Sequence, residues 1–225
     1  MNYLAVGLII IIIIILYYVY YYATNNALTS GLQELNKPLT VTYDKLINPN
    51  SLTYSYQTWI YLSMPTATST KIFHRGSSET ATSEFQVDIC GQTLELQAGT
   101  GSNAPSRIMT ITTNFPIQKW TYLVVNVSNL STFEAYINGK LAKTVKVSNS
   151  VLPTSKTSSL YIGNTSLNGY VTKFTRLPKV LDAKTVWENY LSGNGLSSFL
   201  SALMPYGLNM SISNGEDVVR VVTMW

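Results

Sequence analysis

The stretch WTYLVVNVSNLSTFEAYINGKLAKTVKV, from Trp120 to Val147, decides the fold of this chain. Two sets of side chains alternate along it with a period of two, which predicts β-strands. The first alternation sets Tyr122, Val124 and Asn126 against Leu123, Val125 and Val127, and the second sets Phe133, Ala135 and Ile137 against Glu134 and Tyr136. Asn138-Gly139 then supplies the two positive-φ positions that a type I′ turn requires. We therefore predict a β-hairpin that returns along Leu141–Val147.

Similar runs occur on both sides of this hairpin, separated by turn residues and with almost no helical periodicity before residue 182. The runs are Tyr54–Leu62, Lys71–Arg75, Phe85–Ile89, Thr93–Gln97, Arg107–Thr112, Ser159–Gly163 and Gly169–Arg176. Short strands at such regular spacing are typical of two facing sheets, so we expect an all-β sandwich or jelly roll.

One short helix is expected at Ala183–Leu191, because Asp182 precedes it as an N-cap and Gly193 follows its end. Its apolar side is expected to pack on the sandwich and consists of Val186, Trp187, Tyr190 and Leu191.

The succession of motifs along the chain resembles a known family. The motifs are YSYQTWIYL from Tyr54, KIFHRG from Lys71, FPIQKWTYLVVNV from Phe115, FEAYINGKLAKTV from Phe133, LYIGNTSLNGYVTKF from Leu160 and LPKVLDAKTVWENYLSG from Leu177. They are similar, over residues 51–193, to the concanavalin A-like jelly roll of the laminin-G and pentraxin type. The landmarks that match in order are Trp120, Asn138-Gly139, Ile162-Gly163, Gly169 and Leu181–Gly193. The resemblance implies a fold rather than a function, because this fold hosts sugar binders, glycosidases and structural modules.

The N-terminal segment predicts a membrane anchor. Leu4 to Tyr22 runs for 19 positions without a charge and contains seven consecutive isoleucines, Ile9 to Ile15. A helix of this length spans roughly 28 Å, close to the thickness of the hydrocarbon core. The anchor residues that we predict are Leu4, Ile9, Ile12, Ile15 and Leu16, followed by an interfacial belt of Tyr17, Tyr18, Tyr20, Tyr21 and Tyr22.

Two alternatives to an uncleaved single-pass anchor are a cleaved signal peptide and a buried soluble helix. A signal peptide would need a basic start and small residues at a cleavage site, and the chain has no Lys or Arg before Lys37. The orientation stays open, because Lys37 and Lys45 are too far from the span and too few to decide a side.

The chain therefore divides into an anchor over residues 1–23, a stalk over 24–50, a sandwich over 51–193 and an extension over 194–225. The extension contains an apolar loop, Phe199 to Met204, and a strand-like run from Val218 to Trp225. That run either returns to a sheet edge or pairs with another protein. The partner-docking residues that we predict are Val218, Val219, Val221 and Trp225.

The residues do not favour an enzyme. Glycosidases need two carboxylates flanking one bond, and only Glu84 and Asp88 come near that pattern. If both lie on one strand, their side chains share a face but stand about 13 Å apart, which is too far. The only histidine, His74, excludes a triad or a multi-histidine metal site and is expected to be structural. We predict no catalytic residue, no cofactor and no metal, although a calcium site built from Asp88 with loop carbonyls stays open.

Other side chains are expected to support the fold. The chain has a net charge of +4 without dense basic patches, so no nucleic-acid partner is expected. Lys140, Lys143 and Lys146 are interpreted as guards of an edge strand, with an anionic contact surface as the alternative. The lone Cys90 is expected in the core. Three tryptophans, Trp59, Trp120 and Trp187, are expected to face the core rather than a sugar.

Two functions fit these features. The first is a membrane-anchored adaptor whose sandwich and tail bind neighbouring proteins, and the second is a membrane-tethered glycan-binding module. An anchor followed by such a domain, in a short chain rich in Tyr and Asn, is also similar to membrane-anchored proteins of large DNA viruses. That resemblance implies a minor capsid protein that links an outer protein shell to an inner membrane of the virion.

Overall fold

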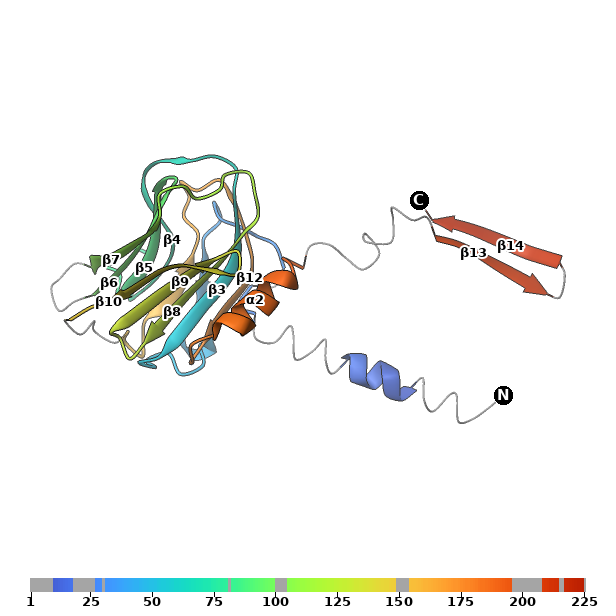
Figure 1. Ribbon diagram of the computed structural model, residues 1–225, viewed down its shortest axis with the longest axis horizontal. Coiled ribbons are helices and arrows are strands. Elements are labelled where there is room, and N and C mark those ends of the chain that lie inside the picture. Colours follow the sequence, from blue (N-terminus) through green and yellow to red (C-terminus); the bar gives the residue numbers. More distant parts are fainter. Residues whose placement is uncertain are drawn as a thin grey trace.

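The structure is a computed structural model that describes residues 10–17, 27–29, 31–80, 82–99, 105–148, 154–195, 208–214 and 217–224. Two antiparallel six-stranded sheets face each other and form a sandwich (Figure 1). The all-β prediction, with one short helix on the sandwich, is confirmed.

The first sheet, called sheet A, has the strand order β1-β12-β3-β8-β9-β10. Its strands are β1 (Gln33–Glu34), β12 (Gly169–Leu177), β3 (Tyr54–Leu62), β8 (Thr121–Ser128), β9 (Thr132–Ile137) and β10 (Lys140–Lys146). The predicted hairpin is β9–β10, and its turn residues Asn138 and Gly139 have φ of 50° and 78°. These two positive values are what the type I′ turn requires.

The second sheet, called sheet B, has the strand order β2-β11-β4-β5-β6-β7. Its strands are β2 (Leu39–Val41), β11 (Ser159–Ile162), β4 (Thr66–Gly76), β5 (Phe85–Gly91), β6 (Thr93–Gly99) and β7 (Pro105–Thr112). A third sheet of two strands is formed by β13 (Leu208–Asn214) and β14 (Asp217–Met224). A 3-10 helix, η1 (Tyr43–Lys45), follows β2.

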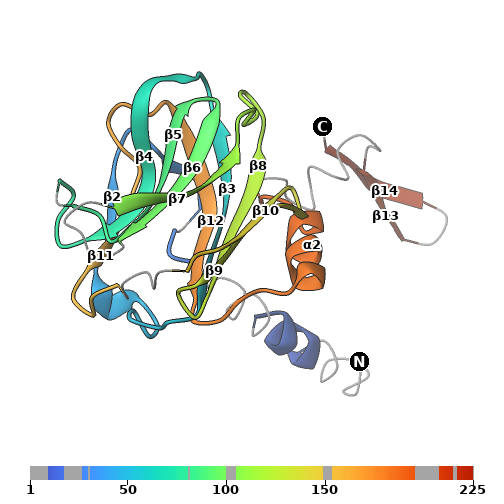
Figure 2. The same ribbon diagram turned by 60° about the vertical axis from the view of Figure 1, so that its left-hand side comes forward.

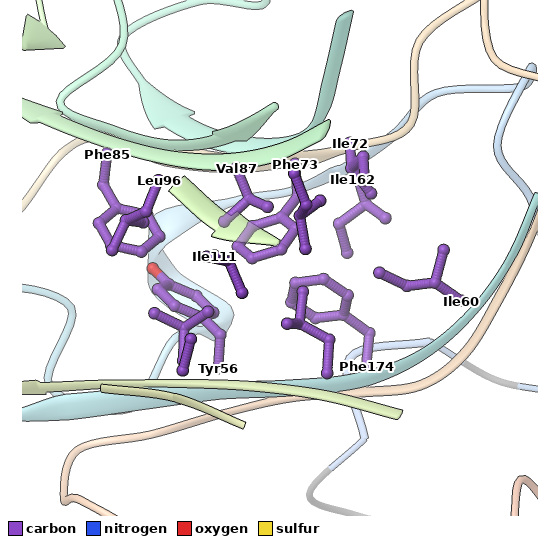
Figure 3. Close-up of a cluster of buried hydrophobic side chains, with 14 of the residues drawn as sticks. Tyr56, Ile60, Ile72, Phe73, Phe85, Val87, Leu96, Ile111, Ile162 and Phe174 are labelled. Carbon is purple, nitrogen blue, oxygen red and sulfur yellow. The ribbon is translucent and has the colours of Figure 1, made fainter. Parts of the chain in front are cut away.

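The core lies between the two six-stranded sheets, because every second residue of each strand points inward. Figure 3 shows Tyr56, Ile60 and Phe174 of sheet A facing the apolar side chains of sheet B. The labelled partners from sheet B are Ile72, Phe73, Phe85, Val87, Leu96, Ile111 and Ile162. The aromatic rings pack directly, with 5.1 Å between the centroids of Tyr56 and Phe85.

Helix α2 (Ala183–Leu191) lies on the outer face of sheet A, as Figures 1 and 2 show. Its predicted bounds and N-cap are confirmed, because Asp182 Oδ1 accepts a hydrogen bond from the Thr185 amide at 2.9 Å. That hydrogen bond and the Thr185 hydroxyl lower the pKa of Asp182. Gly193 follows the helix with φ of 70°, as a C-terminal stop residue should.

The segment that we predicted as a stalk, residues 24–50, contributes to the sandwich. Strands β1 and β2 pair with β12 and β11, and Leu35, Val41 and Leu46 are buried. The prediction that the folded domain starts at residue 51 is therefore corrected. Its error has a physical cause: these strands have only two and three residues, too few to show a period.

Candidate functional site

Helix α2 covers part of the outer face of sheet A. A cluster of Trp59, Tyr122, Val124, Tyr136, Leu181 and Val186 is buried there. Asn126 fixes the approach to the helix, because its side chain donates to the Leu181 carbonyl at 2.8 Å and accepts from the Leu181 amide at 3.1 Å. This part of the face is therefore a second small core, and burial there raises the pKa of Tyr122.

Beyond the helix, the same outer face carries three half-buried aromatic residues, which we call the aromatic face: Tyr61, Trp120 and Tyr170. The ring centroid of Tyr61 lies 5.6 Å from that of Trp120 and 6.3 Å from that of Tyr170. Tyr61 follows Trp59 by two residues on β3, so the alternation of the strand places both on one face. Partly exposed Trp and Tyr with polar tips are typical of contact surfaces.

The predicted core tryptophans do not all reach a core. Trp59 is buried, Trp120 is half-buried and packs against the second small core, and Trp187 is 40% exposed. Trp187 lies across the β9–β10 turn, where a side chain at Gly139 would collide with its ring. The prediction for Trp187 is therefore wrong. Leu191 is also exposed, so the packed side of α2 is narrower than we expected.

The outer face of sheet B carries two polar rows that run across the strands. In the first, called the Gln row, cross-strand pairing aligns Tyr161, His74, Gln86, Gln97 and Arg107. In the second, called the Asp88 row, it aligns Lys71, Asp88, Glu95 and Thr110. Sequence analysis missed both rows, because they depend on strand register rather than on spacing along the chain.

The rows are joined by hydrogen bonds around Asp88. Its Oδ2 accepts from the side-chain amides of Gln86 at 2.6 Å and Gln97 at 3.0 Å. Gln86 also donates to Gln97 Oε1 at 3.2 Å, which fixes the orientation of both amides. Burial raises the pKa of Asp88. In the Gln row, His74 stacks on Tyr161 with 5.0 Å between ring centroids, and burial lowers the pKa of His74 to about 4.

Glu84 and Asp88 do not form a catalytic pair on one strand. Glu84 precedes β5, and its carboxylate accepts from the Ser155 amide at 2.8 Å and the Ser158 hydroxyl at 2.6 Å. Asp88 is held separately in its own row. Our placement of both side chains on one strand is therefore wrong. Within the described part of the chain, no three His, Cys, Asp or Glu side chains form a group that would hold a metal ion.

Two smaller predictions have different outcomes. Cys90, which we expected in the core, is exposed at the end of β5. Its position two residues beyond Asp88 puts it on the outer face, which explains the error. The lysines of β10 do lie on an edge strand, because β10 is the last strand of sheet A and all of its residues except Val145 are exposed.

The segments of the chain just before and just after the sandwich are both bound at one place on β12. The Leu28 amide donates to the Phe174 carbonyl at 2.7 Å, and the Phe174 amide donates to Thr29 Oγ1 at 3.1 Å. Lys173, the preceding residue, donates through Nζ to the Gly193 carbonyl at 2.8 Å. Leu28, Thr29 and Gly193 therefore lie against neighbouring residues of β12.

Only part of the predicted anchor lies within the described residues. Residues 10–17 are helical and include Ile12, Ile15, Leu16 and Tyr17, all exposed. The other predicted anchor residues, Leu4, Ile9, Tyr18, Tyr20, Tyr21 and Tyr22, lie outside the described residues. Across the ranges that the structure describes, no helix has the length and apolar character to span a membrane.

The predicted docking residues Val218, Val219 and Val221 lie on β14, which pairs with β13 and with neither six-stranded sheet. Trp225 and the apolar loop Phe199 to Met204 lie outside the described residues. The run from Val218 had two predicted alternatives, a return to a sheet edge or pairing with another protein. The described strands do not return to an edge of the sandwich.

Comparisons with known proteins agree with this architecture. The sequence model of the concanavalin A-like lectin/glucanases superfamily matches residues 36–194. No relative was found among curated proteins.

Solved structures with the same fold include binding domains of botulinum neurotoxins. The serotype D ligand-binding domain in complex with N-acetylneuraminic acid matches with a TM-score of 0.58 and 13% identity, over 76% of this chain and 45% of that chain. The binding domain of neurotoxin DC in complex with rat synaptotagmin II matches with a TM-score of 0.53 and 17% identity, over 69% of this chain and 39% of that chain. This chain spans less than half of either neighbour, and at such identities the likeness shows the fold alone.

Proposed function

The chain belongs to the concanavalin A-like lectin/glucanases superfamily, and on this premise we propose that it is a membrane-anchored adaptor that binds neighbouring proteins. The observation that carries the proposal is the attachment of Leu28 and Gly193 at the neighbouring residues Phe174 and Lys173. The parts of the chain that lead to the predicted anchor and to the hairpin therefore start from one place on the sandwich.

The hairpin β13–β14 supports a docking role. Two strands that pair only with each other are marginally stable in water, so a hairpin of this kind gains stability when a partner adds a strand or covers one face. Register places Leu208 opposite Met224 and Met210 opposite Val222. The sequence therefore has apolar residues at these paired positions, which suits a protein partner.

The aromatic face supports a second contact. Tyr61, Trp120 and Tyr170 combine large ring area with polar tips, and such residues dominate the binding energy of many interfaces. In the neurotoxin DC complex, a domain of the same fold is solved with a protein, synaptotagmin II. The setting that we propose is a virion of a large DNA virus, with the anchor in the inner membrane and an outer shell protein as the partner.

The test is site-specific photo-crosslinking in the native assembly. Probes replace Val219 on the hairpin and Tyr61 on the aromatic face, and a matched control replaces Thr144 on β10, at the opposite edge of sheet A from β12. We expect the Val219 probe to capture a different protein species and the Thr144 probe to capture none. If the Val219 probe crosslinks only within its own chain, the adaptor proposal is wrong.

A second candidate function is glycan binding, and the polar rows on sheet B favour it. Carboxylate, amide and aromatic groups on one sheet face are the groups that recognise sugar hydroxyls and rings. A domain of the same fold is solved with N-acetylneuraminic acid. The test is to screen the chain on a glycan array with and without calcium. If the chain is only an adaptor, no glycan should bind, whereas reproducible binding would support the second function.

A further inference from the structure

Asp88 is a buried carboxylate on a sheet face that points away from the core. It is 4% exposed, and its neighbours Val87 and Ile89 point into the core. Its Oδ2 has two amide donors, whereas its Oδ1 is buried without any hydrogen-bond partner. A buried acceptor without a donor costs free energy, and such atoms in native proteins call for a specific explanation.

The surrounding groups orient Asp88 and leave Oδ1 as its one open acceptor. Gln86 and Gln97 hold Oδ2 from one side. Across the strands, Lys71 and Glu95 are the direct neighbours, and Glu95 already accepts from Arg107 at 3.0 Å. The carboxylate is therefore held in one orientation before any ligand arrives.

The side chains next to Asp88 are long and polar, in contrast to the packed apolar core beneath it. Lys71 and Gln97 are both only half-buried. Side chains of this kind change rotamer readily at a protein surface, whereas core side chains are locked by close packing. A ligand can thus reach Oδ1 where Lys71 moves aside, while the hydrogen bonds from Gln86 and Gln97 to Oδ2 stay in place and the sandwich is undisturbed.

The chemistry around Oδ1 selects the ligand. Lys71 puts positive charge beside Asp88, and Arg107 offsets the negative charge of the neighbouring Glu95, which disfavours a metal ion there. A neutral hydroxyl donates to a carboxylate oxygen without adding charge, and the amides of the Gln row offer further donors and acceptors to adjacent hydroxyls.

We propose that the Asp88 row and the Gln row bind a neutral, hydroxyl-rich ligand of the oligosaccharide class, with Asp88 Oδ1 accepting a hydrogen bond from one ligand hydroxyl. The proposal deepens the second candidate function and rests on it.

The test uses the full chain in detergent micelles on an array of neutral and sialylated oligosaccharides, with calcium or with EDTA. The variant Asp88→Asn keeps the size of the side chain and removes its charge. Its matched control, Glu188→Gln, removes one exposed charge on α2, over the opposite sheet. We expect binding of neutral oligosaccharides that weakens about tenfold or more in Asp88→Asn, stays unchanged in Glu188→Gln and does not depend on calcium.

A second variant, Gln97→Ala, covers the case in which Asp88→Asn does not fold. Gln97 is half-buried at the surface, and its loss removes an amide from both rows, so we expect weaker binding with the thermal midpoint little changed.

Three results would overturn the proposal. A blank array excludes both the site and the glycan-binding function. Neutral oligosaccharides that bind both variants as well as the parent chain leave glycan binding intact and exclude this site. Binding that disappears in EDTA shows that a cation holds the ligand in place of Asp88 Oδ1.

Discussion

Buried titratable residues make the stability of the sandwich depend on pH, and His74 is the clearest case. Burial lowers its pKa to about 4, below the ordinary value of 6.5. Between these two pH values the unfolded chain takes up a proton that the native chain does not. The contribution of His74 is therefore complete above about pH 6.5 and is lost as the pH falls towards 4, by at most about 3 kcal/mol.

His74→Phe tests this contribution, because Phe keeps a ring to stack on Tyr161 and does not titrate. We expect the parent chain to lose more unfolding free energy than His74→Phe when guanidinium unfolding is moved from about pH 7.5 to about pH 5. Equal losses in the two proteins would show that His74 is not the group responsible.

At the scale of single residues, the sequence predicts which side chains share a face but not which faces are covered. Trp59 and Trp187 were both predicted to face the core, yet only Trp59 is buried, beneath α2, whereas Trp187 on α2 itself is exposed. Nothing in the sequence predicted that Arg75 and Arg176 would be buried. Both are buried and both donate to the Pro49 carbonyl, at 3.1 and 3.2 Å. A main-chain carbonyl from a distant loop leaves no mark in the sequence around either arginine.

At the scale of elements, one buried amide fixes the chain just before α2, beside the apolar packing of the second small core. Asn126→Leu removes both hydrogen bonds to Leu181 and leaves a buried N–H and a buried carbonyl without partners. We expect a loss of about 2–3 kcal/mol in the free energy of unfolding, with faster amide hydrogen exchange in α2. Urea unfolding and hydrogen exchange measure the two effects.

The control for this variant is Asn114→Ala, a change at an exposed loop residue, for which we expect less than about 0.5 kcal/mol. An Asn126→Leu variant as stable as the control would mean that packing of Val186 and Tyr190, rather than the amide, holds the helix.

Elements with strong local signals were predictable, and those made by distant pairing were not. Strand β3 and helix α2 have the predicted bounds, because one has a clear alternation and the other has both of its caps. Strands β1 and β2 exist only because β12 and β11 pair with them. The polar rows of sheet B have the same origin, since cross-strand register brings Gln86 beside Gln97 and Asp88 beside Glu95.

At the scale of the whole molecule, the account joins three parts: an apolar N-terminal segment, a sandwich and a C-terminal hairpin. Leu28 and Gly193, which lead to the two outer parts, are held at the neighbouring residues Phe174 and Lys173. Photo-crosslinking at Val219 tests whether the hairpin contacts another protein. Such a contact supports a membrane-anchored adaptor only if the N-terminal segment holds the chain in a membrane.

The most direct test of the central claim is alkaline carbonate extraction of membranes that contain the full chain, followed by mass spectrometry of its N-terminus. The control is a variant without residues 1–23, which should be released. We expect the full chain to stay in the membrane pellet with its isoleucine segment intact. Release of the full chain by carbonate, or a mature N-terminus beyond Tyr22, would contradict the account.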